Sequence, residues 1–286
     1  MCTEPSSHPS DGPHWQTDRV QVSLVQFAAA TDADANLETI SRLVRQAQDS
    51  RPAREDDQLV VLPEAAMHDF GPVDLALGPT AQRIDGPFVA GLARLARQAD
   101  ATIVAGMFET SDDPARPYNT VVVVGPGGDV LGRYRKIHLY DSFGERESDR
   151  LTAGDGVPVV LPVAGLSLGL LTCYDLRFPE LARALVDDGA DTLVVPAAWL
   201  RGPLKEDHWT TLLRARAIEN TTFVLAAGQC GSSYIGATMA VDPSGVVLAA
   251  CGPGEGVVAA RVERSVVDEV RRRNPSLANR REPRVR

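Results

Sequence analysis

Three residues that are far apart in the sequence could together carry out one reaction on a carbonyl group. Cys173 ends the apolar run LGLLTC, Glu64 follows VVLP, and Lys136 follows RYR. A thiol attacks a carbonyl carbon as its thiolate, but an ordinary cysteine, with a pKa of about 8.5, is mostly protonated at neutral pH. Glu64 could take the proton, while Lys136 and the backbone N–H of Tyr174 could stabilise the negative oxygen of the tetrahedral intermediate. These residue types predict nucleophilic catalysis by cysteine.

Each of the three residues has an ordinary structural interpretation when it is taken alone. A glutamate at a strand end is usually a surface carboxylate, a lysine after RYR is usually part of a solvated edge, and an isolated cysteine usually fills a core. They become informative together, because residues just beyond strand ends converge at one edge of a sheet. The sequence therefore predicts one small cavity that receives Glu64, Lys136 and Cys173.

Two further residues are candidates for binding the substrate. Arg177, four residues after Cys173, could hold a substrate carboxylate with two parallel hydrogen bonds. Alternatively, Arg177 pairs with Asp175 or Glu180 and only holds the turn. Trp199, at the end of VVPAAW, could line the pocket or could equally be a core tryptophan.

Other nucleophile and base assignments are weaker. His138 or His208 could form a Cys-His dyad with Cys173, but no cysteine protease motif surrounds that cysteine. Cys230 also ends a strand-like run, yet no recognisable motif supplies it with a base or an oxyanion donor. We therefore interpret Cys230 as structural.

The residues that could do chemistry sit in a chain of alternating strands and helices. Alternation of β-branched residues predicts strands, and apolar residues at helical spacing predict helices. The expected strands are 20–27, 58–64, 101–109, 191–199 and 221–231, the hairpins are 118–136, 157–175 and 237–251, and the helices are 36–48, 86–99, 178–189 and 208–220. Hairpins mixed with βα units indicate mixed sheets. Two strand-rich halves predict an α/β fold, a four-layer α-β-β-α sandwich of two mixed sheets.

A dinucleotide-binding fold is less consistent with the sequence. The only glycine-rich turn, GPGGD at 125–129, lies between two strands and opens no helix, so it cannot present amide groups to a pyrophosphate. We predict a hairpin turn there.

Composition limits the class of protein. The chain has 286 residues, 44% of them hydrophobic, which is enough for one large domain, and its net charge of -9 argues against a general binder of nucleic acid or anionic membranes. The four cysteines show neither zinc-ligand spacing nor a disulfide framework, and residues 1–18 lack the features of a signal peptide. We expect a cytoplasmic protein with a disordered lead-in at 1–18 and a single domain at 19–286.

The phrases LPEA, YRKIHLYD and CYDLRFPE, in this order, resemble the nitrilase superfamily of carbon-nitrogen hydrolases from about residue 19 to the end. The resemblance implies that Glu64 is the general base, Lys136 the oxyanion-stabilising lysine and Cys173 the nucleophile that forms a thioester. It also implies the α-β-β-α sandwich, no metal or organic cofactor, and a homodimer or higher homo-oligomer. By the same resemblance, the arginine-rich segment 271–286 is a C-terminal arm that reaches across the dimer. Because the protein is acidic overall, we prefer this interpretation to nucleic-acid binding.

Members of this superfamily usually carry a second active-site glutamate. Of the two glutamates in YDSFGERESDRLTAGD, Glu147 fits the family pattern better than Glu145. CYDLRFPE further resembles the Nit-type branch, which cleaves ω-amides such as α-ketoglutaramate or deaminated glutathione. The resemblance thus implies a cysteine hydrolase of small linear amides that releases ammonia. Our candidate substrate-binding residues are Tyr174, Arg177 and Trp199.

Several alternatives to an ω-amidase remain open. A nitrilase or an N-carbamoyl amino acid hydrolase would use the same three residues, and an acyltransferase would differ only in what attacks the thioester. A non-catalytic binding protein on the same fold is the alternative from another class. A binding protein would have no need to keep Glu64, Lys136 and Cys173.

Overall fold

The computed structural model describes residues 19–49 and 56–281. The expected lead-in at 1–18 and the last five residues of the expected arm, 282–286, lie outside the described residues. Residues 271–273 are the last turn of a helix, α5 (Arg264–Arg273), so the segment that we predicted as an arm begins inside regular structure.

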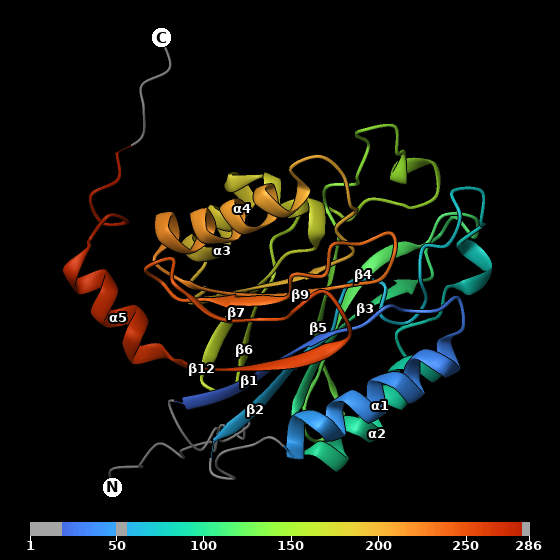
Figure 1. The fold of residues 1–286 in the computed structure, drawn as a ribbon, viewed down its shortest axis with the longest axis horizontal. Helices are drawn as coiled ribbons and strands as arrows, with labels where there is room; N and C mark the ends of the chain where they lie inside the picture. Colours follow the sequence, from blue (N-terminus) through green and yellow to red (C-terminus); the bar gives the residue numbers. More distant parts are fainter. Residues whose placement is uncertain (1–18, 50–55, 282–286) are drawn as a thin grey trace, which may run out of the picture.

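Two six-stranded sheets form the centre of the molecule (Figure 1). The first has the order β12-β1-β2-β3-β4-β5, and the second has the order β11-β10-β9-β8-β7-β6. The strands of the first sheet are β1 (Arg19–Gln26), β2 (Asp57–Val61), β3 (Thr102–Glu109), β4 (Tyr118–Val124), β5 (Val130–Arg135) and β12 (Gly256–Glu263). Those of the second are β6 (Val160–Val163), β7 (Leu166–Leu170), β8 (Thr192–Ala197), β9 (Phe223–Gly228), β10 (Met239–Val241) and β11 (Val247–Ala250).

Each sheet is mixed, as the sequence predicts. In the first sheet β1, β2 and β3 run parallel to one another, and the other pairings are antiparallel. In the second, β7, β8 and β9 are parallel and are flanked by antiparallel strands. The turn GPGGD joins β4 to β5 and is closed by a hydrogen bond from Gly125 N to Asp129 O at 2.9 Å, so the predicted hairpin is confirmed.

Helices cover the outer face of each sheet and complete the four layers (Figure 1). The first sheet carries α1 (Ala33–Asp49) and α2 (Pro87–Ala99), and the second carries α3 (Pro179–Asp187) and α4 (Lys205–Asn220). The sequence marks α3 at both ends: Pro179 suits the first helical position, and Gly189 adopts a φ of 100° just beyond the last turn. The predicted α-β-β-α sandwich is confirmed.

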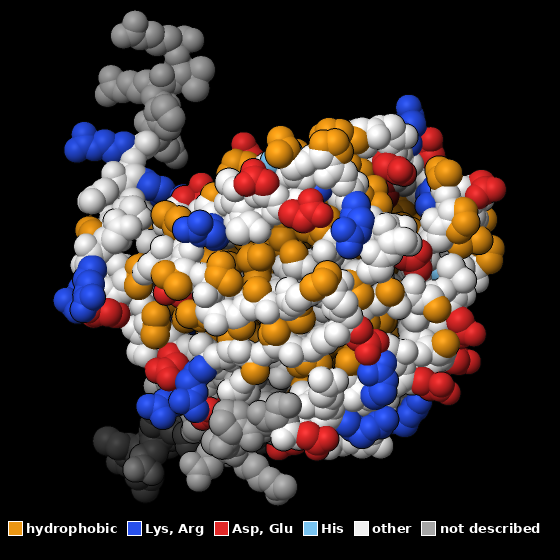
Figure 2. Space-filling view, in the orientation of Figure 1, with side chains coloured by type: hydrophobic (Ala, Val, Ile, Leu, Met, Phe, Trp, Pro, Cys, Tyr) orange, Lys and Arg blue, Asp and Glu red, His pale blue; other side chains and the backbone are white. Residues whose placement is uncertain are grey.

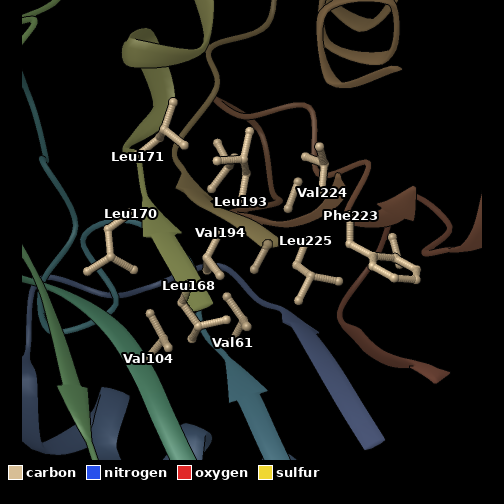
Figure 3. Close-up of a cluster of buried hydrophobic side chains, with 14 of the residues drawn as sticks. Val61, Val104, Leu168, Leu170, Leu171, Leu193, Val194, Phe223, Val224 and Leu225 are labelled. Carbon is tan, nitrogen blue, oxygen red and sulfur yellow. The ribbon is translucent and has the colours of Figure 1, made fainter. Parts of the chain in front are cut away.

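The core follows from alternation along the strands. Val20, Val22 and Leu24 of β1 face the second sheet, whereas Val25 faces α1 and α2. Figure 3 shows Val61 and Val104 from the first sheet beside Leu168 from the second, in the layer between the sheets. Burying these apolar faces against each other contributes about 25 cal/mol per Å² of apolar surface, which fixes the two sheets in one relative position.

The outer surface is mixed in character. Figure 2 shows acidic and basic side chains interspersed around the edge of one face, while apolar side chains gather across its middle. Val247 and Leu248 of the edge strand β11 are among the exposed apolar residues. None of the helices in the described ranges has the length and hydropathy of a membrane span.

Candidate active site

Glu64 follows β2 and is held rigidly by three donors. Its Oε1 accepts hydrogen bonds from Asn119 Nδ2 at 2.7 Å and from Lys136 Nζ at 2.9 Å, and its Oε2 accepts one from the Ala198 backbone N–H at 2.6 Å. Only 1% of Glu64 is exposed. Because donors occupy both oxygens, the carboxylate is fixed in position.

Lys136 follows β5 and lies between two carboxylates. Its Nζ donates to Glu64 Oε1 and to both oxygens of Glu147, all at 2.9 Å. Burial alone would lower the pKa of Lys136, but the charges of Glu147 and Glu64 outweigh burial and raise it well above the usual lysine value. The side chain is therefore a permanent ammonium inside the protein.

Glu147, not Glu145, is the second glutamate next to Lys136. Its Oε2 also accepts a hydrogen bond from the Tyr140 backbone N–H at 2.5 Å. Burial, together with the charge of Glu64, raises the pKa of Glu147, although Lys136 opposes the change. Glu145 is exposed and lines the cavity without an ion pair to Lys136. The choice of Glu147 over Glu145 thus agrees with the geometry.

Cys173 is the first residue of a short 3₁₀ helix, η3 (Cys173–Arg177), and two residues separate it from the end of β7. Its φ of 48° is a left-handed value that a non-glycine residue adopts at a cost of about 1–3 kcal/mol, and such values cluster at functional sites. Burial first, and then the charge of Glu64, raise the pKa of the thiol well above its ordinary value, whereas Lys136 lowers it. The resting cysteine is thus a neutral thiol beside a carboxylate.

Asp175 fixes the turn that carries Cys173. Its carboxylate accepts hydrogen bonds from Thr172 N at 2.9 Å, Tyr134 OH at 2.7 Å, His138 N at 3.0 Å and His138 Nδ1 at 2.7 Å. The hydrogen bond from the Thr172 backbone N–H to the Asp175 side chain also caps the start of η3. Since Tyr134 and His138 flank Lys136, Asp175 ties the cysteine turn to the lysine segment.

One cavity of about 660 Å³ receives every site residue that the sequence predicts. Its lining includes Glu64, Lys136, Glu147, Cys173, Tyr174, Arg177 and Trp199. Loops that follow the strands contribute further residues, among them Asp69, Phe70, Tyr140 and Tyr234, and Lys205 comes from the start of α4. The strand ends therefore meet at one edge, as expected, and form a cavity large enough for a small organic substrate.

Arg177 faces the cavity without a carboxylate partner among the described residues. Its guanidinium carbon lies 4.8 Å from the ring centroid of Trp199, and its NH2 lies 3.4 Å from His208 Nδ1. Asp175 is fully occupied by other donors, and no ion pair joins Arg177 to Glu180. The alternative in which Arg177 pairs with Asp175 or Glu180 is wrong.

Trp199 is both a core and a cavity residue. It is 4% exposed, packs against Trp209 at 5.2 Å, and donates its Nε1 hydrogen to the Lys205 backbone oxygen at 3.1 Å. It also lines the cavity. The two interpretations offered by the sequence are therefore both correct.

The weaker candidates lie outside the cavity. His138 is bound to Asp175, with its ring stacked on Phe178, and His208 contacts Arg177; neither lines the cavity, and Cys230 does not either. Among the described residues, no cluster of three or more His, Cys, Asp or Glu side chains could hold a metal ion.

Three residues of the site were not predicted as such: Asn119, Asp175 and Lys205. Asn119 and Asp175 act only through contacts between distant segments, which no local pattern reveals. Lys205 carried a signal: it is the first residue of α4, where the helix dipole disfavours a cation. A lysine at that position suggested a requirement other than helix stability.

The comparisons with known proteins agree with one another. The family model described as carbon-nitrogen hydrolase matches residues 21–272. The chain is 42% identical over 261 residues to the deaminated glutathione amidase of Escherichia coli O157:H7, a match that covers 91% of this chain and 97% of that protein.

Two solved structures are also similar to this chain. The C. elegans NitFhit protein has a TM-score of 0.81 and 30% identity, and covers 92% of this chain and 65% of its own. Saccharomyces cerevisiae Nit3, a member of branch 10 of the nitrilase superfamily, has a TM-score of 0.78 and 25% identity, and covers 94% of this chain and 97% of its own.

Proposed function

Because the chain belongs to the carbon-nitrogen hydrolase family and is an amidase-type enzyme, we propose that it cleaves small linear amides through a thioester on Cys173. The proposed substrates are ω-amides of dicarboxylic or 2-oxo acids, and ammonia is the first product. Glu64 is the general base, Lys136 stabilises the oxyanion, and Glu147 holds Lys136 in place.

The first half of the reaction forms the thioester. Glu64 takes the thiol proton as the sulfur of Cys173 attacks the amide carbon, and the carbonyl oxygen becomes an oxyanion stabilised by Lys136 Nζ and the backbone N–H of Tyr174. As the tetrahedral intermediate collapses, the C–N bond breaks and the nitrogen takes the proton from Glu64. Ammonia leaves, and the acyl group remains on sulfur.

The second half hydrolyses the thioester. Glu64, again a carboxylate, removes a proton from water, whose oxygen attacks the thioester carbon through a second oxyanion. The C–S bond breaks, and the sulfur recovers its proton from Glu64. The acid leaves, and the enzyme returns to its neutral-thiol state.

One observation supports this assignment more than any other. The Nζ of Lys136 lies 2.9 Å from Oε1 of Glu64, and both residues line one cavity with Cys173. A surface role would leave these groups solvated, and a core role would leave the cysteine without a charged neighbour. A neutral thiol with a raised pKa requires a base at the moment of attack, and the Glu64 charge is a cause of that raised pKa.

The acidic substrate class is supported by Arg177. Its guanidinium faces the cavity with no carboxylate partner among the described residues, so a bound carboxylate would supply the missing counter-charge. The relatives named deaminated glutathione amidase are consistent with an acid-bearing amide.

Ammonia release from a substrate panel tests the proposal. The panel contains the monoamides of succinic, glutaric and 2-oxoglutaric acids, short nitriles and N-carbamoyl amino acids. We expect the monoamides to be the best substrates and Cys173→Ala to abolish their turnover. Ammonia release that is unchanged in Cys173→Ala would contradict the mechanism, and preference for nitriles or carbamoyl compounds would contradict the substrate class.

Hydroxylamine distinguishes hydrolysis from acyl transfer. A hydrolase yields mainly the free acid in dilute hydroxylamine, whereas an acyltransferase yields mainly the hydroxamate. Turnover of no compound by the wild-type protein would favour the non-catalytic binding protein.

The assembly and location that the sequence predicts stay proposals. Exposed Val247 and Leu248 on β11 are compatible with a homo-oligomer. Sedimentation of the purified protein measures its oligomeric state, and microscopy of a tagged chain tests the cytoplasmic location.

A further inference from the structure

Lys205 is a buried cation without a matching anion. It is 5% exposed and lines the same cavity as Cys173. Its Nζ donates one hydrogen bond, to Tyr140 OH at 2.7 Å, and lies 4.2 Å from the ring centroid of Phe143. No carboxylate in the described ranges forms an ion pair with it. Removing an ammonium from water is costly unless it is paired, so folding alone does not explain this lysine.

Arg177 is a second cation without a matching anion, and like Lys205 it lies near the ring of Trp199. Its Nε is buried with no hydrogen-bond partner, and it too has no ion pair with any described residue. Burial first, and then the charge of Arg177, lower the pKa of Lys205, so the two cations are close enough to repel each other. Two unneutralised cations together in one cavity require an anion that the described residues do not provide.

We propose that Lys205 and Arg177 jointly bind the carboxylate at the non-reacting end of the substrate, and that Lys205 selects acidic over neutral amides. The inference rests on the proposed function and narrows its substrate class. A carboxylate has four lone-pair positions, so it can accept a bidentate pair from the guanidinium and still accept a hydrogen bond from the ammonium.

Tyr140 connects this subsite to the reacting groups. Its hydroxyl accepts the hydrogen bond from Lys205, and its backbone N–H donates to Glu147, which in turn binds Lys136. Lys205 is therefore connected to Lys136 through two residues, Tyr140 and Glu147. A substrate held by its carboxylate at Lys205 presents its other end toward Cys173, which lines the same cavity.

The test compares an acidic and a neutral amide of similar length. Succinamate carries the carboxylate, and butyramide replaces it with a methyl group. We expect Lys205→Met, which keeps the aliphatic stem and the backbone oxygen that binds Trp199, to raise KM for succinamate about 10- to 100-fold. KM for butyramide should change less than threefold. Arg201→Met is the matched control, because it removes one exposed cation from the neighbouring loop outside the cavity lining.

Binding provides a readout that does not depend on turnover. Succinate should bind to the Cys173→Ala protein in calorimetry, and Lys205→Met in that background should weaken binding about 10-fold or more, with Arg201→Met unchanged. Tyr140→Phe keeps the ring but removes the hydrogen-bond acceptor, so it should weaken binding by a smaller factor. This variant also serves if Lys205→Met fails to fold.

The outcomes separate this inference from the proposed function. Equal changes in KM for succinamate and butyramide in Lys205→Met, or no succinate binding to the Cys173→Ala protein, would overturn the subsite. Turnover that survives in Cys173→Ala would overturn the cysteine mechanism while leaving a Lys205-dependent binding of succinate intact.

Discussion

The Nζ of Lys136 lies 2.9 Å from Oε1 of Glu64, so the proposed oxyanion donor and the proposed base are hydrogen-bonded to each other before any substrate arrives. Both groups are almost fully buried. This contact holds the carboxylate and the ammonium in place, so neither group needs to reorganise when charge develops on the substrate. It also means that a change at one residue alters the chemistry of the other.

Removing the charge of Glu64 should affect turnover and thiol acidity in opposite directions. We expect Glu64→Gln to lower kcat by about 10²- to 10⁴-fold, since the base is lost. The same variant should lower the pKa of Cys173, because the Glu64 charge raises that pKa and Lys136 lowers it. At a fixed pH of about 8, near the ordinary thiol pKa, iodoacetamide should therefore alkylate Cys173 faster than in the wild-type protein.

Peptide mass spectrometry follows this alkylation at Cys173 separately from Cys230 and Cys251. If the thiol becomes less reactive in Glu64→Gln, the charge of Lys136 does not lower the pKa of Cys173 as expected once the carboxylate is removed. Retained amidase turnover in that variant would remove Glu64 from the mechanism.

Substitution of Glu147 should lower kcat far more than substitution of Glu145. Glu147→Gln should lower kcat by about 10- to 100-fold, because Nζ of Lys136 is then no longer held from both sides and small misplacements are costly. Glu145→Gln should change kcat less than about twofold, as expected of an exposed residue without a contact to Lys136. Steady-state kinetics of the two variants, with thermal melting as a check of folding, decides between them; the reverse order would assign the role to Glu145.

The backbone behind Glu64 leaves no room for a methyl group at Gly106 of β3. A Cβ there would lie 2.5 Å from the Ala65 backbone nitrogen and 2.7 Å from Glu64 Cα. We expect Gly106→Ala to destabilise the protein by about 1–3 kcal/mol and to lower kcat, because the clash is with backbone that cannot move without displacing the carboxylate. Urea unfolding and amidase assays measure both effects. Gly252→Ala, where nothing lies within 4 Å, is the control, and a neutral Gly106→Ala would contradict the fixed position of Glu64.

The fold class and the reacting residues could be predicted because their signals are local. Glu64, Lys136 and Cys173 each follow a strand, and strand ends meet at a sheet edge in any such fold. The pairing of β12 with β1 was not predicted, because it joins the two ends of the chain and depends on no short-range pattern.

The contacts that support the site residues could not be predicted from the sequence for a related reason. In the sequence, Asp175 is one more polar residue of CYDLRFPE. Only the tertiary structure brings Tyr134 of β5 and His138, three residues beyond β5, to its carboxylate. Lys205 likewise donates its hydrogen bond to Tyr140, which is sixty-five residues away in the chain. Such contacts follow from how loops pack over the sheet edge, and that packing is set by tertiary structure.

The lowered pKa of Lys205 predicts a pH dependence that is specific to acidic substrates. A lysine whose pKa lies below 10.5 loses its proton, and thus its attraction for a carboxylate, at a lower pH than an ordinary lysine. KM for succinamate should rise on the alkaline side below pH 10.5, while KM for butyramide should not follow it. In Lys205→Arg the rise should move to higher pH, because a guanidinium stays charged. Identical alkaline limbs for both amides would exclude Lys205 as their origin.

Trapping the acyl enzyme shows whether the reaction passes through a thioester on Cys173. Wild-type protein mixed with succinamate and quenched in acid within the first turnovers should carry an added succinyl group, and peptide mapping should place it on Cys173. The adduct should be absent from Cys173→Ala, which should also release no ammonia. An acyl group on Cys230 or Cys251, or ammonia released at the wild-type rate by Cys173→Ala, would contradict the account.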